Sequence, residues 1–214
     1  MSESRTVPVD QRWLGMDKRA IPYAVVAVAL IAVLIYVLPA INGATDWSDE
    51  TAAGDVIDMG AGTTFTPPAG WLLEGGIRTS DEPAVPVNAS RSSAELVNGG
   101  VSVSVAGSDW DGTADELLDQ ANRLRDNSDQ DADKLFKVTG ARDSFTTASG
   151  IPGVSETFTS ATGDGTTWAF VIDDTDGGST GIVFTAVTSN GTNAGYAGEI
   201  EAMVSSLAST ESTS

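Results

Sequence analysis

An uninterrupted apolar run near the N-terminus constrains this chain more than any other feature. Residues 21–41 (IPYAVVAVALIAVLIYVLPAI) contain no charged side chain. As a helix, these 21 residues extend about 31 Å, which matches the hydrocarbon thickness of a bilayer. The run is longer than the apolar core of a usual secretory signal, and no A-x-A cleavage pattern follows it. The pattern therefore predicts a retained transmembrane helix and disfavours the alternative, a cleaved signal peptide.

The charges on either side of this run predict its orientation. Four basic residues precede it, and the next one, Arg78, comes only after a series of acidic residues. The positive-inside rule then places residues 1–20 in the cytoplasm and the remainder outside the plasma membrane. The first 20 residues carry four basic and three acidic side chains, a net +1, whereas the rest carries seven basic and 27 acidic side chains, a net −20. The acidity thus belongs to the exported part.

Composition excludes several classes of chemistry. The chain has no cysteine and no histidine, so a Ser-His-Asp triad, a thiolate nucleophile, a disulfide framework and a His-bearing metal site are all ruled out. The negative charge argues against nucleic-acid binding. No nucleophile or phosphate-loop motif is present, and nothing pairs the available glutamates; Glu199 and Glu201, two apart on a predicted helix, should point to different faces. We expect no catalytic residue and no cofactor.

Clusters of aspartate raise the question of a Ca²⁺ site. The spacing of Asp129, Asp131 and Asp133 resembles the start of an EF-hand loop, but Lys134 and Gly140 stand where that loop requires glycine and glutamate. Turns and helix caps explain such clusters without a metal, so no metal site is predicted, although a weak divalent site outside the cell stays an alternative. The other clusters are Asp109, Asp111 and Asp115, and Asp173, Asp174 and Asp176.

The exported part has the pattern of an α+β domain with an antiparallel sheet and packed helices. Val101, Val103 and Val105 alternate with serine, as in a strand with one wet face. Thr113 and Glu116 form a capping box that predicts a helix to about residue 126. Further strands are expected at 135–139, 144–147, 154–159, 168–172 and 182–188, and a closing helix carries Tyr196, Ile200, Met203, Val204 and Leu207 on one face. We expect residues 77–93 to be irregular, residues 42–62 to form a linker, the domain to cover 63–208 and residues 209–214 to form a disordered tail.

These segments resemble a known family. The motif FTPPAGW, the helix DGTADELLDQANRLR, the strands around GIPGVSETF, TWAFVID and GIVFTAVT, and the final MVSSL are similar to the PsbP-like fold, and closest to the actinobacterial LpqN-type envelope proteins. The resemblance covers about residues 63–208. It implies accessory work on membrane complexes or in envelope lipid transport. The chain departs from that family because it has no cysteine for a lipid anchor, and the predicted transmembrane helix takes that place.

Two short segments are candidate partner interfaces. Trp13, Lys18 and Arg19 precede the membrane run, where they suit either an interfacial anchor or a docking peptide for a membrane partner. Trp110, between Asp109 and Asp111, is the tryptophan expected to be exposed, and exposed aromatics anchor interfaces.

The sequence therefore predicts an accessory or scaffolding subunit. In this hypothesis, the helix holds the chain in the membrane and the acidic domain binds a larger integral membrane complex, such as the respiratory cytochrome bc–aa oxidase supercomplex, or a basic partner outside. The alternative is a lipid- or glycolipid-binding module that assists mycolate-lipid transport. That module needs an apolar cavity above about 300 Å³ between sheet and helix.

Overall fold

The computed structural model describes residues 12–13, 16–17, 31, 35, 49–81, 91–128, 136–160, 163–173, 177–189 and 193–209. The chain divides into two compact units, Met1–Trp47 and Ser48–Ser214. The boundary that the sequence placed at residue 63 therefore falls inside the second unit.

The first unit has few described residues. Strands β1 (Arg12–Trp13) and β2 (Met16–Asp17) form an antiparallel pair in which Trp13 lies opposite Met16. No helix among the described residues is long and apolar enough to cross a membrane. Apart from Ile31 and Ile35, the apolar run at 21–41 lies outside the described residues, as do Lys18 and Arg19.

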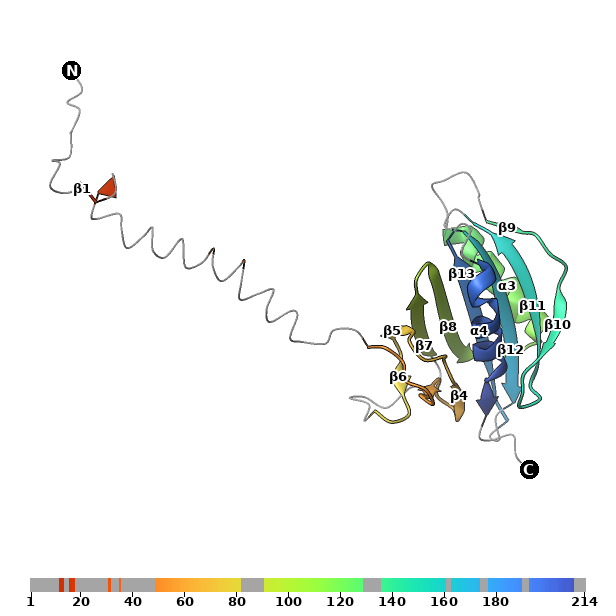
Figure 1. The fold of residues 1–214 in the computed structure, drawn as a ribbon. Coiled ribbons are helices and arrows are strands. Elements are labelled where there is room, and N and C mark those ends of the chain that lie inside the picture. Colours follow the sequence, from red (N-terminus) through yellow and green to blue (C-terminus); the bar gives the residue numbers. More distant parts are fainter. Residues whose placement is uncertain are drawn as a thin grey trace, which may run out of the picture. The chain divides into compact units, whose positions relative to one another are not determined.

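The second unit is built on a large sheet whose neighbouring strands are all antiparallel (Figure 1). This confirms the α+β class and the antiparallel sheet. Valines 101, 103 and 105 are buried as their alternation predicts, and Phe184 sits opposite both Val105 and Trp168 in the sheet register. In order across the described sheet, the strands are β10 (Asp143–Thr146), β11 (Pro152–Thr159), β12 (Asp164–Asp173), β13 (Ser179–Thr188), β8 (Val101–Asp109), β7 (Arg91–Asn98) and β5 (Leu72–Gly75), while β9 (Lys137–Val138) also pairs with β11.

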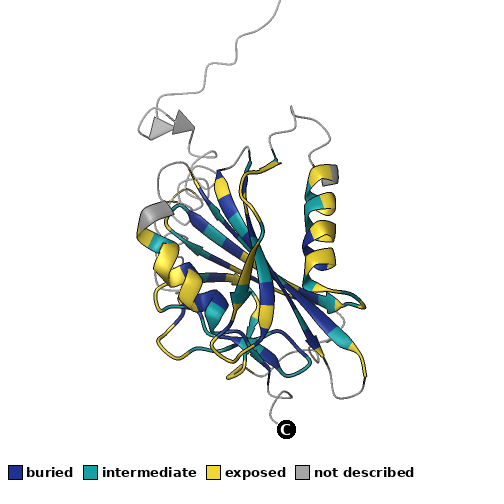
Figure 2. Cartoon of the chain, turned by 90° about the vertical axis from the view of Figure 1, so that its right-hand side faces the viewer, coloured by how far each residue is buried: buried dark blue, intermediate teal, exposed yellow. Residues whose placement is uncertain are grey.

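Two described helices, α3 (Ala114–Ser128) and α4 (Asn193–Ser205), cover opposite faces of this sheet (Figure 2). Strand β12 shows why both faces need cover. Trp168 and Phe170 belong to the core cluster that includes Ile200 of α4, whereas Ala169 packs with Leu117 of α3. Because side chains alternate along a strand, the continuously apolar stretch at 168–172 has to be buried on both sides.

The first turn of α3 has the capping box that the sequence predicts. The Thr113 backbone N–H donates to Glu116 Oε2 at 2.9 Å, and the Glu116 backbone N–H donates to Thr113 Oγ1 at 3.2 Å. Each side chain thus satisfies a backbone donor that the helix itself leaves without a partner. The predicted start of this helix is confirmed.

A smaller sheet lies over the α4 face and changes the predicted boundaries. Its order is β14 (Ala208–Ser209), β4 (Thr63–Phe65), β3 (Ile57–Asp58) and β6 (Ile77–Arg78). Ile57 and Met59, which the sequence assigns to a linker, are fully buried in the core. Ser209, assigned to the tail, pairs with Thr63. Residues 210–214 lie outside the described residues.

Phenylalanine rings join the two sheets. Phe65 of β4 meets Phe184 of β13 with ring centroids 5.4 Å apart, Phe184 meets Phe170 at 6.2 Å, and Phe170 meets Phe145 of β10 at 5.9 Å. All three contacts are edge-to-face, a geometry worth about 0.5–1.5 kcal/mol per pair beyond burial. The chain of rings fixes the small sheet and β10 around one core.

The segment predicted as irregular contains regular structure at both ends. Residues 77–78 form β6 and residues 91–93 begin β7; residues 82–90 lie outside the described residues. Strand β7 buries Ser92, Ala94 and Leu96, an alternation that small and polar residues obscure in the sequence. Similarly, the strand expected at 154–159 begins two residues earlier, because β11 starts at Pro152.

Candidate functional site

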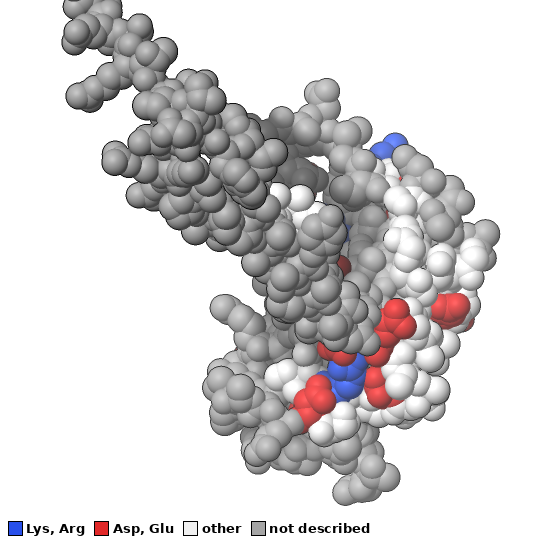
Figure 3. All heavy atoms as spheres, turned by 60° about the vertical axis from the view of Figure 1, so that its left-hand side comes forward, with Lys and Arg blue, Asp and Glu red and all other residues white. Residues whose placement is uncertain are grey.

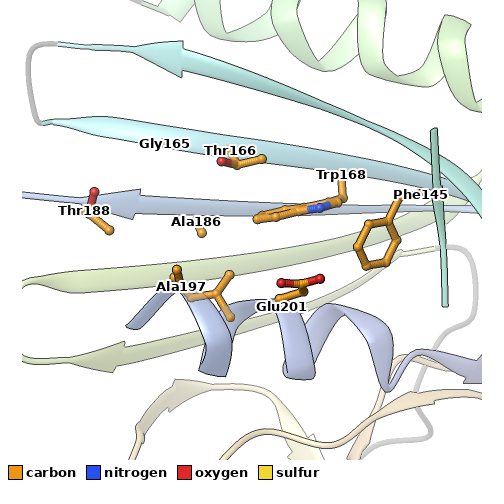
Figure 4. A pocket seen from close by; sticks show the side chains of 9 residues that line it. Phe145, Gly165, Thr166, Trp168, Ala186, Thr188, Ala197 and Glu201 are labelled. Carbon is orange, nitrogen blue, oxygen red and sulfur yellow. The ribbon is translucent and has the colours of Figure 1, made fainter. Parts of the chain in front are cut away.

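A cavity of about 210 Å³ lies between the large sheet and helix α4 (Figure 4). Strand β12 supplies Trp168, β10 supplies Phe145, and α4 supplies Glu201. The remaining lining residues are small, short or aliphatic: Gly165, Thr166, Ala186, Thr188, Ala197 and Ile200. The site therefore combines segments that are far apart in the sequence.

The cavity exists because short residues stand opposite the large ones. Ala197 and Ala186 leave space between helix and sheet where a leucine would fill it. Gly165 lies at the floor, and a Cβ there would lie 2.4 Å from Phe158 Cζ and 2.5 Å from the Ala186 carbonyl oxygen. Any larger residue at 165 would displace a core aromatic ring, so the floor of the cavity is fixed by packing on the opposite face.

Aromatic rings and one carboxylate give this cavity its chemical character. In Figure 4, the indole of Trp168 and the ring of Phe145 border the cavity, and the Glu201 carboxylate points between them. Within the described part of the chain, the Glu201 side chain forms no hydrogen bond or ion pair. The Trp168 indole N–H also has no hydrogen-bond partner among the described residues. Its nitrogen is not fully buried. One acceptor group and one donor are thus available to a ligand.

Helix α4 is held in the rotation that presents Glu201 to the cavity. Trp71 Nε1 donates to Glu199 Oε2 at 2.8 Å, while Ile200, Met203 and Val204 are buried in the core. Glu199 therefore faces Trp71 and Glu201 faces the cavity. The prediction that these two glutamates point in different directions is confirmed.

A second hollow of about 370 Å³ lies at the turn between β7 and β8. Its lining is Val97, Gly99, Gly100, Val101, Ser102, Val187 and Ser189, with no charged or aromatic side chain. It is wider and more open than the cavity under α4. We regard it as a surface depression between strand ends.

Arg142 lies at the centre of an ion-pair cluster beneath α3. Its guanidinium lies 2.8 Å from Asp119 Oδ1, 3.0 Å from Asp115 Oδ1 and 3.1 Å from Glu156 Oε2. Hydrogen bonds to Asp119, and further ones to Asp115 and Glu156, raise the pKa of Arg142 against the effect of burial. Glu156 is only 8% exposed and also accepts from Asn122 Nδ2 at 2.8 Å. This cluster fixes α3 to β11, and its geometry is that of a structural network.

Arg78 forms a second cluster at the start of the folded unit. Its Nη2 lies 2.7 Å from Asp49 Oδ1, and its Nε lies 2.8 Å from Asp55 Oδ2. The hydrogen bond from the Ala52 backbone N–H, followed by that from Arg78, lowers the pKa of Asp55. Figure 3 shows a face of the molecule on which acidic side chains surround a basic one. The cluster fastens residues 49–55 to β6.

A third arginine is also engaged inside the fold. Arg125 of α3 lies over Phe158 and Phe136 at 4.6 and 5.0 Å from the ring centroids, and it donates to Thr185 Oγ1 at 2.9 Å. In the described part of the second unit, 16 exposed Asp and Glu residues contrast with two exposed basic residues, Arg123 and Lys137. The fold thus increases the acidity of the surface beyond what composition gives.

The predicted interface residues are not brought together with this cavity. Trp110 is half-buried against the cluster around Leu117 of α3, and its Nε1 donates to the Thr113 carbonyl at 3.2 Å. Trp110 thus packs against the first turn of α3, and its side chain is less exposed than the sequence predicts. Asp109 and Asp111 are exposed on either side of it. Trp13 lies in β1, in the first unit.

Among the described residues, no group of three or more Asp, Glu, His or Cys side chains could hold a metal ion. The cluster at Asp109, Asp111 and Asp115 is included in this statement. Asp173 is exposed at the end of β12, whereas residues 129, 131, 133, 174 and 176 lie outside the described residues.

Sequence reasoning missed the roles of Phe145 and Glu201. It placed Trp168 in the core, which is confirmed at 9% exposure, but did not anticipate that the same ring forms a cavity wall. One feature of the sequence could have indicated the cavity. Ala197, a short residue, lies one helical turn before Glu201 on the closing helix.

No protein-family model matches the chain, and no curated protein matches it. The resemblance to the PsbP-like fold therefore rests on the sequence motifs alone.

Proposed function

We propose that the chain is a single-pass, membrane-anchored accessory subunit whose acidic extracytoplasmic domain binds a basic protein partner. The observation that carries the proposal is the charge of the described surface: 16 exposed acidic residues against two exposed basic ones. Such a surface attracts a positively charged partner over distances of about a Debye length and repels acidic ones.

The anchor is the apolar run at 21–41. Its length and flanking charges support a helix that crosses the membrane once with the N-terminus inside. Two of its residues are described: Ile31 and Ile35 expose 53% and 57% of their surface. Four positions apart, they would share one helix face, and lipid would cover that apolar surface.

The partner we propose is a component of a larger membrane complex. The resemblance to PsbP-like and LpqN-type proteins supports an accessory role, and among actinobacterial complexes the cytochrome bc–aa oxidase supercomplex is the host we favour. The alternative of a lipid- or glycolipid-binding module has less support. The cavity under α4, about 210 Å³, is smaller than the 300–1,000 Å³ of usual small-molecule sites.

Affinity purification of the tagged full chain from membranes in mild detergent tests the proposal. We expect partner subunits with basic external surfaces to co-purify at low ionic strength and to be lost as salt shortens the screening length to about 3 Å at 1 M. The variant Asp109→Asn/Asp111→Asn should retain less partner than wild type. Asp143→Asn/Asp164→Asn is the matched control, because it removes the same charge from exposed positions that the sheet register places away from Asp109. Recovery of the chain alone at low salt would contradict the proposal.

A further inference from the structure

The cavity under α4 has the chemistry of a site for an organic cation. Trp168 and Phe145 border it with aromatic rings, and the Glu201 carboxylate points into it (Figure 4). The faces of aromatic rings carry partial negative charge and attract ammonium and guanidinium groups. A carboxylate beside them adds a charge-assisted hydrogen bond. An anion would meet repulsion from Glu201, and a purely apolar group would leave that carboxylate without a partner.

The size of the cavity limits the ligand to a single extended side chain. Its volume of about 210 Å³ is below the roughly 300–1,000 Å³ of sites that enclose a whole small molecule. The four-carbon stem and ammonium of a lysine, or the stem and guanidinium of an arginine, are objects of this scale. Their stems would contact Ala197, Ala186 and Ile200, which line the cavity with apolar surface.

The described arginines that pair with side chains do so with groups other than Glu201. Arg78, Arg125 and Arg142 are engaged by other partners. In the described part of the chain, the Glu201 side chain has no ion pair or hydrogen bond. The contact between Trp71 and Glu199, two residues earlier, holds α4 in the rotation that directs Glu201 inward. Glu201 is exposed and has no partner among the described residues to give up when it accepts a cation.

We infer that this cavity binds one lysine or arginine side chain of the basic protein partner. The inference rests on the proposed function, since the partner is the protein that the acidic domain attracts. The general negative charge brings the partner to the surface, and the cavity under α4 fixes its register through Trp168, Phe145 and Glu201. Glu201 and Trp168 are binding residues here, and no chemical step is involved.

The test measures the indole N–H signal of Trp168 by NMR in the full chain in detergent. The chain has five tryptophans, and the Trp168 signal is the one lost in Trp168→Phe. The probes are the Nα-acetyl methylamides of lysine and arginine, with that of norleucine as an uncharged control and choline as a free ammonium. We expect the basic probes to shift the Trp168 signal with a dissociation constant of the order of millimolar, and norleucine to leave it unchanged.

Variants separate binding from general charge. Glu201→Gln should weaken binding of both basic probes at least about tenfold. Glu95→Gln removes the same charge from an exposed position on β7 that does not line the cavity, and should bind as wild type. Ala197→Phe keeps the carboxylate but fills the cavity, and should abolish the shift. Equal binding by Glu201→Gln and wild type, an equal response to norleucine, or a response to choline alone would overturn the inference.

Co-purification distinguishes failure of this inference from failure of the proposed function. If Glu201→Gln retains the partner as well as wild type does, the cavity is not the docking point, although the accessory role stands. If wild type retains no partner at low salt, the accessory role fails, whatever the purified chain does with the lysine probe.

Discussion

Trp71 Nε1 donates a hydrogen bond to Glu199 Oε2 at 2.8 Å, across 128 positions of sequence. Trp71 is fully buried, and its ring also meets Tyr196 of α4 edge-to-face at 6.0 Å. These two contacts connect the segment before β5 to the closing helix. They set the rotation of α4, and that rotation decides which glutamate reaches the cavity.

Glu199→Ala should destabilise the folded unit by about 1–3 kcal/mol, because it leaves the buried indole N–H of Trp71 without an acceptor. Urea unfolding of the full chain in detergent, followed by tryptophan fluorescence, measures this change. Glu201→Ala is the matched control on the same helix and should lie within about 0.5 kcal/mol of wild type. Equal stabilities of the two variants would show that the Trp71 contact contributes nothing.

Arg142→Met should lower the free energy of unfolding by about 2 kcal/mol. The buried Glu156 carboxylate then loses its arginine partner and retains only Asn122 among the described residues. Arg123→Met removes an exposed arginine from α3 and should be nearly neutral. Adding Glu156→Gln to Arg142→Met should recover part of the loss, since a neutral amide is less costly to bury. A double variant less stable than Arg142→Met would contradict this account of the cluster.

Asp55 should make stability depend on pH in the acid range. Its pKa lies below its ordinary value of 3.8 in the folded chain, through hydrogen bonds from the Ala52 N–H and from Arg78. The unfolded chain therefore binds the proton first, so the contribution is complete well above pH 3.8 and is lost as pH falls below it. Arg78, whose pKa is raised, stays protonated throughout.

Acid titration of unfolding stability checks this sign. Asp55→Asn should show a shallower fall below pH 3.8 than wild type. Asp164→Asn, which alters an exposed residue with no ion pair in the described part of the chain, should keep the wild-type slope. A fall as steep in Asp55→Asn as in wild type would remove Asp55 from the explanation.

The absence of cysteine allows a direct test of orientation, because a single introduced cysteine is then the only thiol. Ser104 is exposed on β8, and Ser4 lies in the segment predicted to be cytoplasmic. A membrane-impermeant maleimide applied to intact cells should label Ser104→Cys, and should label Ser4→Cys only after the membrane is broken. The reverse pattern would contradict the predicted orientation.

Local patterns in the sequence predicted local structure well. The capping box of Thr113 and Glu116 and the alternating valines of β8 are recognisable because their partners are a few residues away. The start of the folded unit was misplaced because Ile57 becomes structural only by pairing with Phe65 and Arg78. Strand β3, which contains Ile57, has two residues and is too short to show an alternation of apolar and polar side chains.

The candidate site was also not predictable, because its residues are far apart in the sequence and leave no local pattern. Trp168, Phe145 and Glu201 come from three different elements and meet only in the tertiary structure. The sequence indicated that Glu199 and Glu201 diverge, because helix geometry requires it. It could not indicate which of them would find Trp71. Surface charge was predictable in sign, but the engagement of three arginines within the fold was not.

The most direct test of the central claim is the mass of the particle that carries the full chain in mild detergent, measured at low and at high salt. The account predicts a complex well above the 22.0 kDa of one chain plus its detergent at low salt, containing a basic partner that dissociates as salt rises. A particle of one chain alone at low salt would contradict the accessory role.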